Sequence, residues 1–238
     1  MVSLGLLIRL SLFAGPSLFA LLLPLSLLTH HHLPAPCSML LTVLHFLCMR
    51  TNRLEAFSDG VIAILITIMV LELKAPHDPT PASLAQMWPT FFAYVLSFII
   101  IAIYWVNHHH LIHLVTTVDS VILWANINLL FWISLIPWVT VYLGDNHALP
   151  FPVALYAAVS AAGAISFFLL RASIARDHHE PKFKRLNKKM ARKNLVAILI
   201  YLAAMVVAFI YTPLALVMIA LPAMMYFLPE HGLEKYDV

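Results

Sequence analysis

Long apolar segments, separated by short polar breaks, follow one another along the chain after residue 50. A helix needs about 20 mostly apolar residues to cross the hydrocarbon core of a bilayer, and the final, shorter segment would cross with tilt and local thinning. Pro137 lies inside the third segment and predicts a kink there. The pattern predicts an all-α polytopic membrane protein with six transmembrane helices, over residues 54–73, 84–106, 120–143, 150–172, 194–211 and 213–228.

The first 48 residues do not fit this pattern. They are apolar, and Arg9 is their only charged residue. Residues 4–29 are typical of a signal or anchor segment, whereas 38–48 is too short to span a membrane. We favour translation from Met49, with a signal-like segment as the alternative. The predicted division is an N-terminal extension, a six-helix transmembrane domain and a cytoplasmic tail, over residues 1–48, 49–229 and 230–238.

Composition and charge agree with a membrane protein and argue against a nucleic-acid interface. Charged residues make up 11% of the chain and the mean hydropathy is +0.91, whereas soluble domains carry about 25% charged residues. Nine of the 14 lysines and arginines lie between Arg171 and Lys193. A basic block between membrane spans is typical of a cytoplasmic loop. Counting spans from this loop places the start of the first span and the C-terminus in the cytoplasm.

The first predicted span has two chemically different faces. One face carries three aliphatic residues, an aromatic ring and a hydroxyl, which are Ile64, Ile68, Leu71, Phe57 and Thr67. Ser58 and Asp59 project roughly 120–140° away from this stripe if the segment is helical. An aliphatic stripe at this spacing is ordinarily helix packing, so by itself it assigns no function.

Asp59 is harder to explain as packing, because an unpaired carboxylate inside a bilayer costs several kcal/mol. The predicted topology brings the end of the second span and the start of the third span to the same depth. We therefore expect Ser58 and Asp59 to join a hydrogen-bonded cluster that clamps the first span in place. Its other members are expected among Trp105, Asn107, His108, His109, Trp124 and Asn128.

The histidines admit a second interpretation. His109 and His113 are four residues apart, so both would lie on one helical face and could bind a metal. Membrane di-iron oxygenases use several such pairs, and the remaining histidines here are poorly placed for that chemistry. Histidines that hydrogen bond near the membrane interface are the commoner case, so we expect no metal site and no cofactor.

The segment from Arg53 to Thr67, R-x-x-x-F-S-D-G-V-x-A-I-x-x-T, resembles the transmembrane protein 175 family of potassium channels. Further matching motifs are Trp105-x-Asn107-His108-His109 and Trp124-x-Asn-x-Asn128-Leu. Together these motifs and the six-span layout cover residues 49–228.

The resemblance implies a homotetramer of six-helix subunits in which the first helix of each copy lines a central pore. It places rings of pore constriction at Ile64, Ile68 and Leu71 and a hydroxyl layer at Thr67. It also implies that a motif on the same helix holds that helix against the second and third spans. This motif consists of Arg53, Phe57, Ser58 and Asp59.

The expected function is a potassium-selective, leak-type cation channel, with no enzymatic activity. The resemblance further implies a multi-pass protein of a bacterial cell membrane. Its partners would be potassium ions, membrane lipid and three further copies of the chain, with no nucleic acid. The alternatives are a proton- or ion-coupled transporter and, less favoured, a histidine-metal membrane enzyme.

Overall fold

A computed structural model describes residues 51–115, 117–176 and 181–227 of the chain. These residues belong to the second of two units, Met49–Val238. The predicted extension, 1–48, and the predicted tail, 230–238, lie outside the described residues, so their roles stay predictions.

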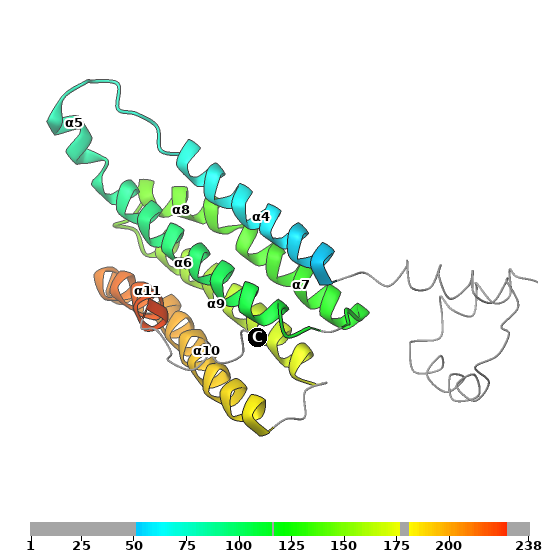
Figure 1. Cartoon of the computed structure of the whole chain (residues 1–238). Helices are drawn as coiled ribbons and strands as arrows, with labels where there is room; N and C mark the ends of the chain where they lie inside the picture. Colours follow the sequence, from blue (N-terminus) through cyan, green and yellow to red (C-terminus); the bar gives the residue numbers. More distant parts are fainter. Residues whose placement is uncertain (1–50, 116, 177–180, 228–238) are drawn as a thin grey trace, which may run out of the picture. The chain divides into compact units, whose positions relative to one another are not determined.

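Helices are the only regular secondary structure among the described residues, and Figure 1 shows the long helices packed lengthwise against one another. This confirms the predicted all-α class. The helices are α4 (Thr51–Leu71), α5 (Pro81–Gln86), α6 (Trp88–Ile112), α7 (Ser120–Ser134), α8 (Ile136–Asp145), α9 (Pro150–Ala175), α10 (Pro181–Val207) and α11 (Thr212–Phe227).

Five helical segments among the described residues are long and apolar enough to cross a membrane. α7 and α8 together form one of them, Ser120–Asp145. The apolar part of α11, Thr212–Tyr226, is shorter than the other five. The sixth span therefore stays a prediction that depends on tilt or thinning of the bilayer.

The third predicted span breaks at Leu135, two residues before Pro137. Pro137 lies in the first turn of α8, where its missing N–H costs little because such donors lack helical partners. The chain continues in nearly the same course, since the Val139 N–H donates to Leu135 O at 3.1 Å. α7 and α8 therefore form one kinked span and not two separate spans.

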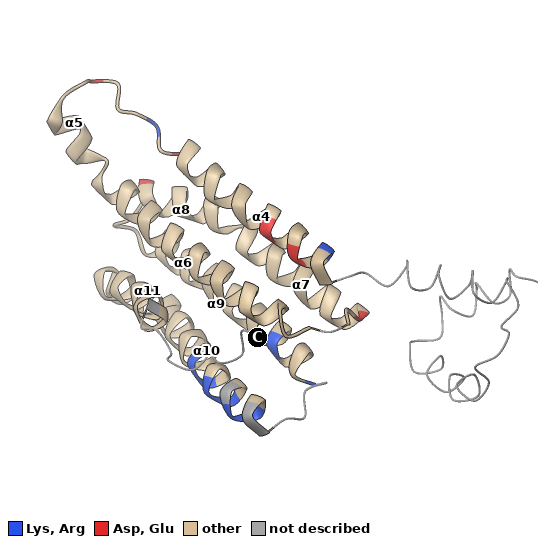
Figure 2. Cartoon of the chain, in the orientation of Figure 1, with Lys and Arg blue, Asp and Glu red and all other residues tan. Residues whose placement is uncertain are grey.

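The basic segment differs from its predicted structure. We expected a loop over 173–193, but α9 continues to Ala175 and α10 begins at Pro181. The physical reason is that Lys, Arg, Leu, Met and Ala are all good helix formers, while the apolar pattern reports only membrane-spanning length. Figure 2 shows lysine and arginine concentrated along the first half of α10.

Helix α9 forms the centre of the packed core, and α4 lies at its periphery. α9 contacts α7, α8, α10 and α11, and 67% of its most apolar stretch is buried. The corresponding share of α4 is 28%. Small residues such as Ala157, Ala161 and Ala164 let neighbouring backbones approach α9 closely. α4 instead packs on α6, α7 and α8 through one face only.

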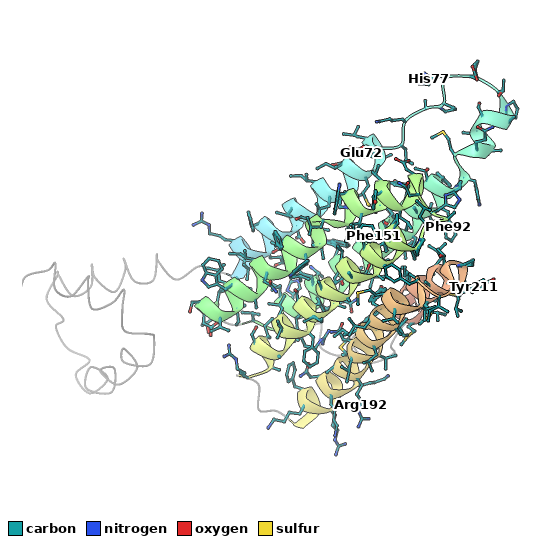
Figure 3. All side chains as sticks on the ribbon, turned by 180° about the vertical axis from the view of Figure 1, so that it is seen from behind. Glu72, His77, Phe92, Phe151, Arg192 and Tyr211 are labelled. Carbon is teal, nitrogen blue, oxygen red and sulfur yellow. The ribbon has the colours of Figure 1, made fainter. Side chains whose placement is uncertain are left out.

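The two ends of the helices differ chemically. Phe92, Phe151 and Tyr211 are all more than half exposed and project toward the same end in Figure 3. Arg192 lies toward the other end. Exposed aromatic rings are typical of both membrane interfaces, so they do not distinguish the two ends, whereas clustered cations are typical of the cytoplasmic side. This distribution agrees with the orientation inferred from the sequence.

Candidate functional site

Helix α4 buries one face and leaves the opposite face free within the chain. The buried positions recur every three or four residues, at Leu54, Ser58, Ile62, Leu65 and Met69. This spacing is that of a helical stripe packed on neighbouring helices. Because the contact is one-sided, the rotation of α4 about its own axis decides which residues form the free face.

The free face carries the predicted stripe. Ile64 is 57%, Ile68 41% and Leu71 78% exposed within the chain. Thr67 is also exposed, and its hydroxyl donates to the Ile64 backbone oxygen at 2.8 Å. A hydroxyl whose hydrogen is already engaged keeps its oxygen lone pairs available for another partner. The surface is thus apolar with one layer of outward-facing oxygen.

A buried polar chain lies on the opposite face of α4 and joins three helices. Ser58, His108 and Asn126 are each 0% exposed. The Ser58 hydroxyl donates to Leu54 O at 2.8 Å and accepts from Asn126 Nδ2 at 2.9 Å. Asn126 Oδ1 and His108 Nε2 are 2.7 Å apart. Since an amide oxygen only accepts, Nε2 carries the hydrogen of this bond. The chain of bonds connects α4, α7 and α6 in that order.

A second set of polar contacts runs along the α4–α6 boundary. Trp105 Nε1 donates to Asp59 Oδ1 at 2.9 Å. One turn nearer the start of α4, Glu55 Oε1 lies 3.0 Å from His109 Nδ1. At the first residue of α4, the Thr51 hydroxyl donates to Val115 O at 3.2 Å. These contacts fix α4 lengthwise against the antiparallel helix α6.

The structure places five of the predicted residues in contacts between helices, but in three separate sets rather than one cluster. Ser58 and His108 both bond to Asn126, Asp59 bonds to Trp105, and His109 bonds to Glu55. Asn107 instead donates to Ile103 O within its own helix at 2.8 Å, and Asn128 donates to Ser166 Oγ on α9 at 2.8 Å. Trp124 is 68% exposed.

The first residues of the motif, Arg53 and Phe57, lie on the free face of α4. Both are exposed within the chain, Phe57 by 55%. Neither contributes to the buried polar chain. If the motif holds α4 against its neighbours, its Ser58 and Asp59 provide the contacts within one subunit.

The sequence reasoning missed two residues, Asn126 and Glu55. The buried positions of α7 recur at Ile122, Asn126, Leu129, Leu130 and Ile133. Asn126 is in phase with this apolar stripe and Asn128 is not, so the helical period was a usable signal. Glu55 lies four residues before Asp59, which places both carboxylates on the side of α4 that faces α6.

Long apolar helices, a surface rich in exposed apolar side chains and buried polar contacts between helices define an integral membrane protein. Comparisons with known proteins make the assignment specific. Residues 53–137 match the family model described as endosomal/lysosomal potassium channel TMEM175.

Individual relatives agree with the family match. A potassium channel of a Chryseobacterium species is 42% identical over 187 residues, which cover 79% of this chain and 97% of that protein. The crystal structure of a lysosomal potassium-selective channel TMEM175 homolog from Chamaesiphon minutus superimposes with a TM-score of 0.68 at 30% identity. The superposition covers 75% of this chain and 96% of the Chamaesiphon minutus chain. The human endosomal/lysosomal proton channel TMEM175 is 36% identical over 72 residues, but only 14% of its length is covered.

The chain therefore belongs to the TMEM175 family, as the motifs predicted. This is a family of channels and not of enzymes.

Proposed function

We propose that this chain is one subunit of a homotetrameric potassium channel in which α4 of each copy lines a central pore. The names of the bacterial relative and of the solved homolog support the ion and the transport class. The single observation that supports the pore is the free face of α4. An apolar stripe with a threonine layer is left uncovered along a helix whose opposite face is firmly packed.

The chemistry of this face suits the passage of a partly dehydrated cation. Four copies of Ile64, Ile68 and Leu71 would form narrow apolar rings that close by dewetting. Potassium loses its hydration water more readily than sodium, so a narrow apolar ring penalises sodium more. The Thr67 oxygen, whose hydrogen points to its own backbone, would replace part of the lost water.

The polar contacts behind α4 would set the rotation of the pore helix. A helix that turned by one residue position, about 100°, would remove Ile64 from the axis. The bonds of Ser58 to Asn126 and of Asp59 to Trp105 oppose such a rotation from two sides. We therefore assign these residues a positioning role and not a place in the ion path.

Proton passage is the second candidate function, because the human relative is named a proton channel. A proton- or ion-coupled transporter is a different alternative, and it would need a carboxylate that faces the transport path. Asp59 bonds to Trp105 and lies off the free face of α4, which favours passive conduction instead.

The location we propose is a bacterial cell membrane, with the C-terminus in the cytoplasm.

The test is ion flux into liposomes that contain the purified full chain. Vesicles loaded with potassium chloride are diluted into sodium chloride with a protonophore, and a pH-sensitive dye reports the proton uptake that balances potassium efflux. We expect strong uptake, and much weaker uptake when vesicles loaded with sodium are diluted into a medium free of both ions. Flux equal to that of protein-free vesicles, or equal for the two ions, would contradict the proposal. Dye response without the protonophore would identify proton passage.

A further inference from the structure

Three potential metal ligands meet at the boundary of α4 and α6, one turn beyond the Asp59–Trp105 contact. Glu55 comes from α4, while His109 and His113 come from the end of α6. Glu55 Oε1 lies 3.0 Å from His109 Nδ1 and 3.4 Å from His113 Nε2. The Nε2 atoms of the two rings are 3.2 Å apart. One ligand atom from each residue lies within 4.8 Å of the others.

The sequence places these groups together for identifiable reasons. His109 and His113 are four residues apart, and His113 keeps helical backbone angles, φ −60° and ψ −20°, so both rings leave the helix on one side. Glu55 is likewise four residues before Asp59 on α4. The bond from Trp105 to Asp59 sets the register of the two helices and thereby brings Glu55 opposite His109.

We propose that Glu55, His109 and His113 form a binding site for a zinc-like divalent metal ion. Two imidazole nitrogens and one carboxylate oxygen are a common three-residue zinc ligand set, with water in the fourth position. A tetrahedral zinc ion with bonds of about 2.0–2.2 Å separates its ligand atoms by roughly 3.3–3.6 Å. The two distances from Glu55 Oε1, 3.0 Å to His109 Nδ1 and 3.4 Å to His113 Nε2, are close to this range. The 3.2 Å contact between the rings uses the other nitrogen of His109, Nε2, so a small rotation of the side chains would bring one nitrogen of each ring and the carboxylate around the ion.

Access and charge also fit a metal ion. The Glu55 side chain is 19% exposed, His109 is 40% and His113 is 59% exposed, so water can reach the open coordination position. The carboxylate supplies negative charge, and imidazole nitrogen is a preferred donor for zinc and its neighbours in the transition series. The bound ion would link the pore helix to α6. This inference concerns equilibrium binding and does not depend on which ion the pore conducts.

The alternative is that Glu55, His109 and His113 are held together by hydrogen bonds alone, with no metal ion. His113 Nε2–H can donate to Glu55 or to His109, which satisfies the geometry without a metal. The two cases differ in one measurable property. Only a metal site binds cobalt or zinc in a manner that depends on all three side chains.

The test uses the purified full chain, stripped with chelator and titrated with Co²⁺ and then Zn²⁺. We expect the visible absorption of four-coordinate cobalt at one ion per subunit, and its displacement by zinc. Glu55→Gln and His113→Gln should each weaken metal binding by roughly 100-fold. Loss of a residue that only supports a metal ligand already weakens binding by about 10–100-fold, and loss of a direct ligand should reach at least the upper end of that range. His110→Gln is the matched control, because His110 adjoins His109 on α6 but is not one of the three proposed ligands, and it should leave binding unchanged.

The melting temperature, measured with and without zinc, distinguishes a variant that has lost the metal site from one that has lost its fold. Zinc should raise the melting temperature of the unmodified chain and of His110→Gln in a concentration-dependent manner, but not that of Glu55→Gln. No cobalt spectrum in the unmodified chain would overturn the proposal. So would stoichiometric binding that survives both Glu55→Gln and His113→Gln, since other histidines would then be the ligands.

Discussion

Replacing Ile64 with asparagine is expected to reduce the preference for potassium over sodium by roughly tenfold, equivalent to about 1.4 kcal/mol of discrimination. Ile64 is the first aliphatic residue of the free face of α4 and is 57% exposed within the chain. A ring of amide groups would hold water in the constriction, so both ions would pass with more of their hydration shell. The penalty on sodium would then fall more than the penalty on potassium.

The measurement is the reversal potential in planar bilayers with potassium on one side and sodium on the other. Val70→Asn is the matched control. Val70 is also on α4 and 48% exposed, but it projects about 120° away from Ile64. An unchanged reversal potential for Ile64→Asn, or an equal change for Val70→Asn, would show that Ile64 is not at the constriction.

Asn126→Ala is expected to destabilise the subunit by about 2–4 kcal/mol. Its amide donates to Ser58 and accepts from His108, and all three residues are fully buried. The substitution leaves the buried His108 N–H without an acceptor, which costs about 1–3 kcal/mol. It also removes the bond to Ser58, worth about 1 kcal/mol, although the Ser58 hydroxyl keeps its bond to Leu54 O. Asp59→Ala removes a bond to Trp105, which is 45% exposed, so it should lower stability and tetramer yield less than Asn126→Ala does.

Melting temperatures of the detergent-solubilised protein, together with the yield of tetramer in size-exclusion chromatography, test this order. Asn128→Ala is the control, because Asn128 is only partly buried and bonds to Ser166 away from α4. We expect Asn126→Ala to melt well below Asn128→Ala. For Asp59→Ala, assembly should suffer more than ion selectivity. Equal melting temperatures for Asn126→Ala and the unmodified chain would show that the hydrogen bonds of Asn126 to Ser58 and His108 do not stabilise the subunit.

Much of the fold was predictable because a bilayer imposes a length and an apolar composition on each span. The apolar segments near 84–106 and 150–172 correspond to α6 and α9. The start of α10 was not predictable in this way. Its helix begins at Pro181, in a basic segment that no apolar pattern marks. Helix propensity, and not hydropathy, was the relevant property there.

The site was predictable only in part, for a similar reason. Asp59 stood out because a carboxylate in a membrane span needs a partner, and Trp105 was among the expected donors. The choice between Asn126 and Asn128 depended on the helical phase of α7. The apolar stripe of α7 carries this information, but which neighbouring helix each side of α7 faces, α4 for Asn126 and α9 for Asn128, is set by the packing. Glu55 was missed because residues near the start of a span can reach water, so its charge alone did not require a partner.

The arrangement of four α4 helices around one axis is the central claim, and cysteine cross-linking tests it most directly. In a chain whose Cys37 and Cys48 are replaced by serine, Ile64→Cys should form disulfide-linked dimers of subunits on mild oxidation in the membrane. Leu199→Cys, on α10 and 58% exposed, should remain monomeric on a denaturing gel. Linked dimers from Leu199→Cys with none from Ile64→Cys would place α4 away from the axis.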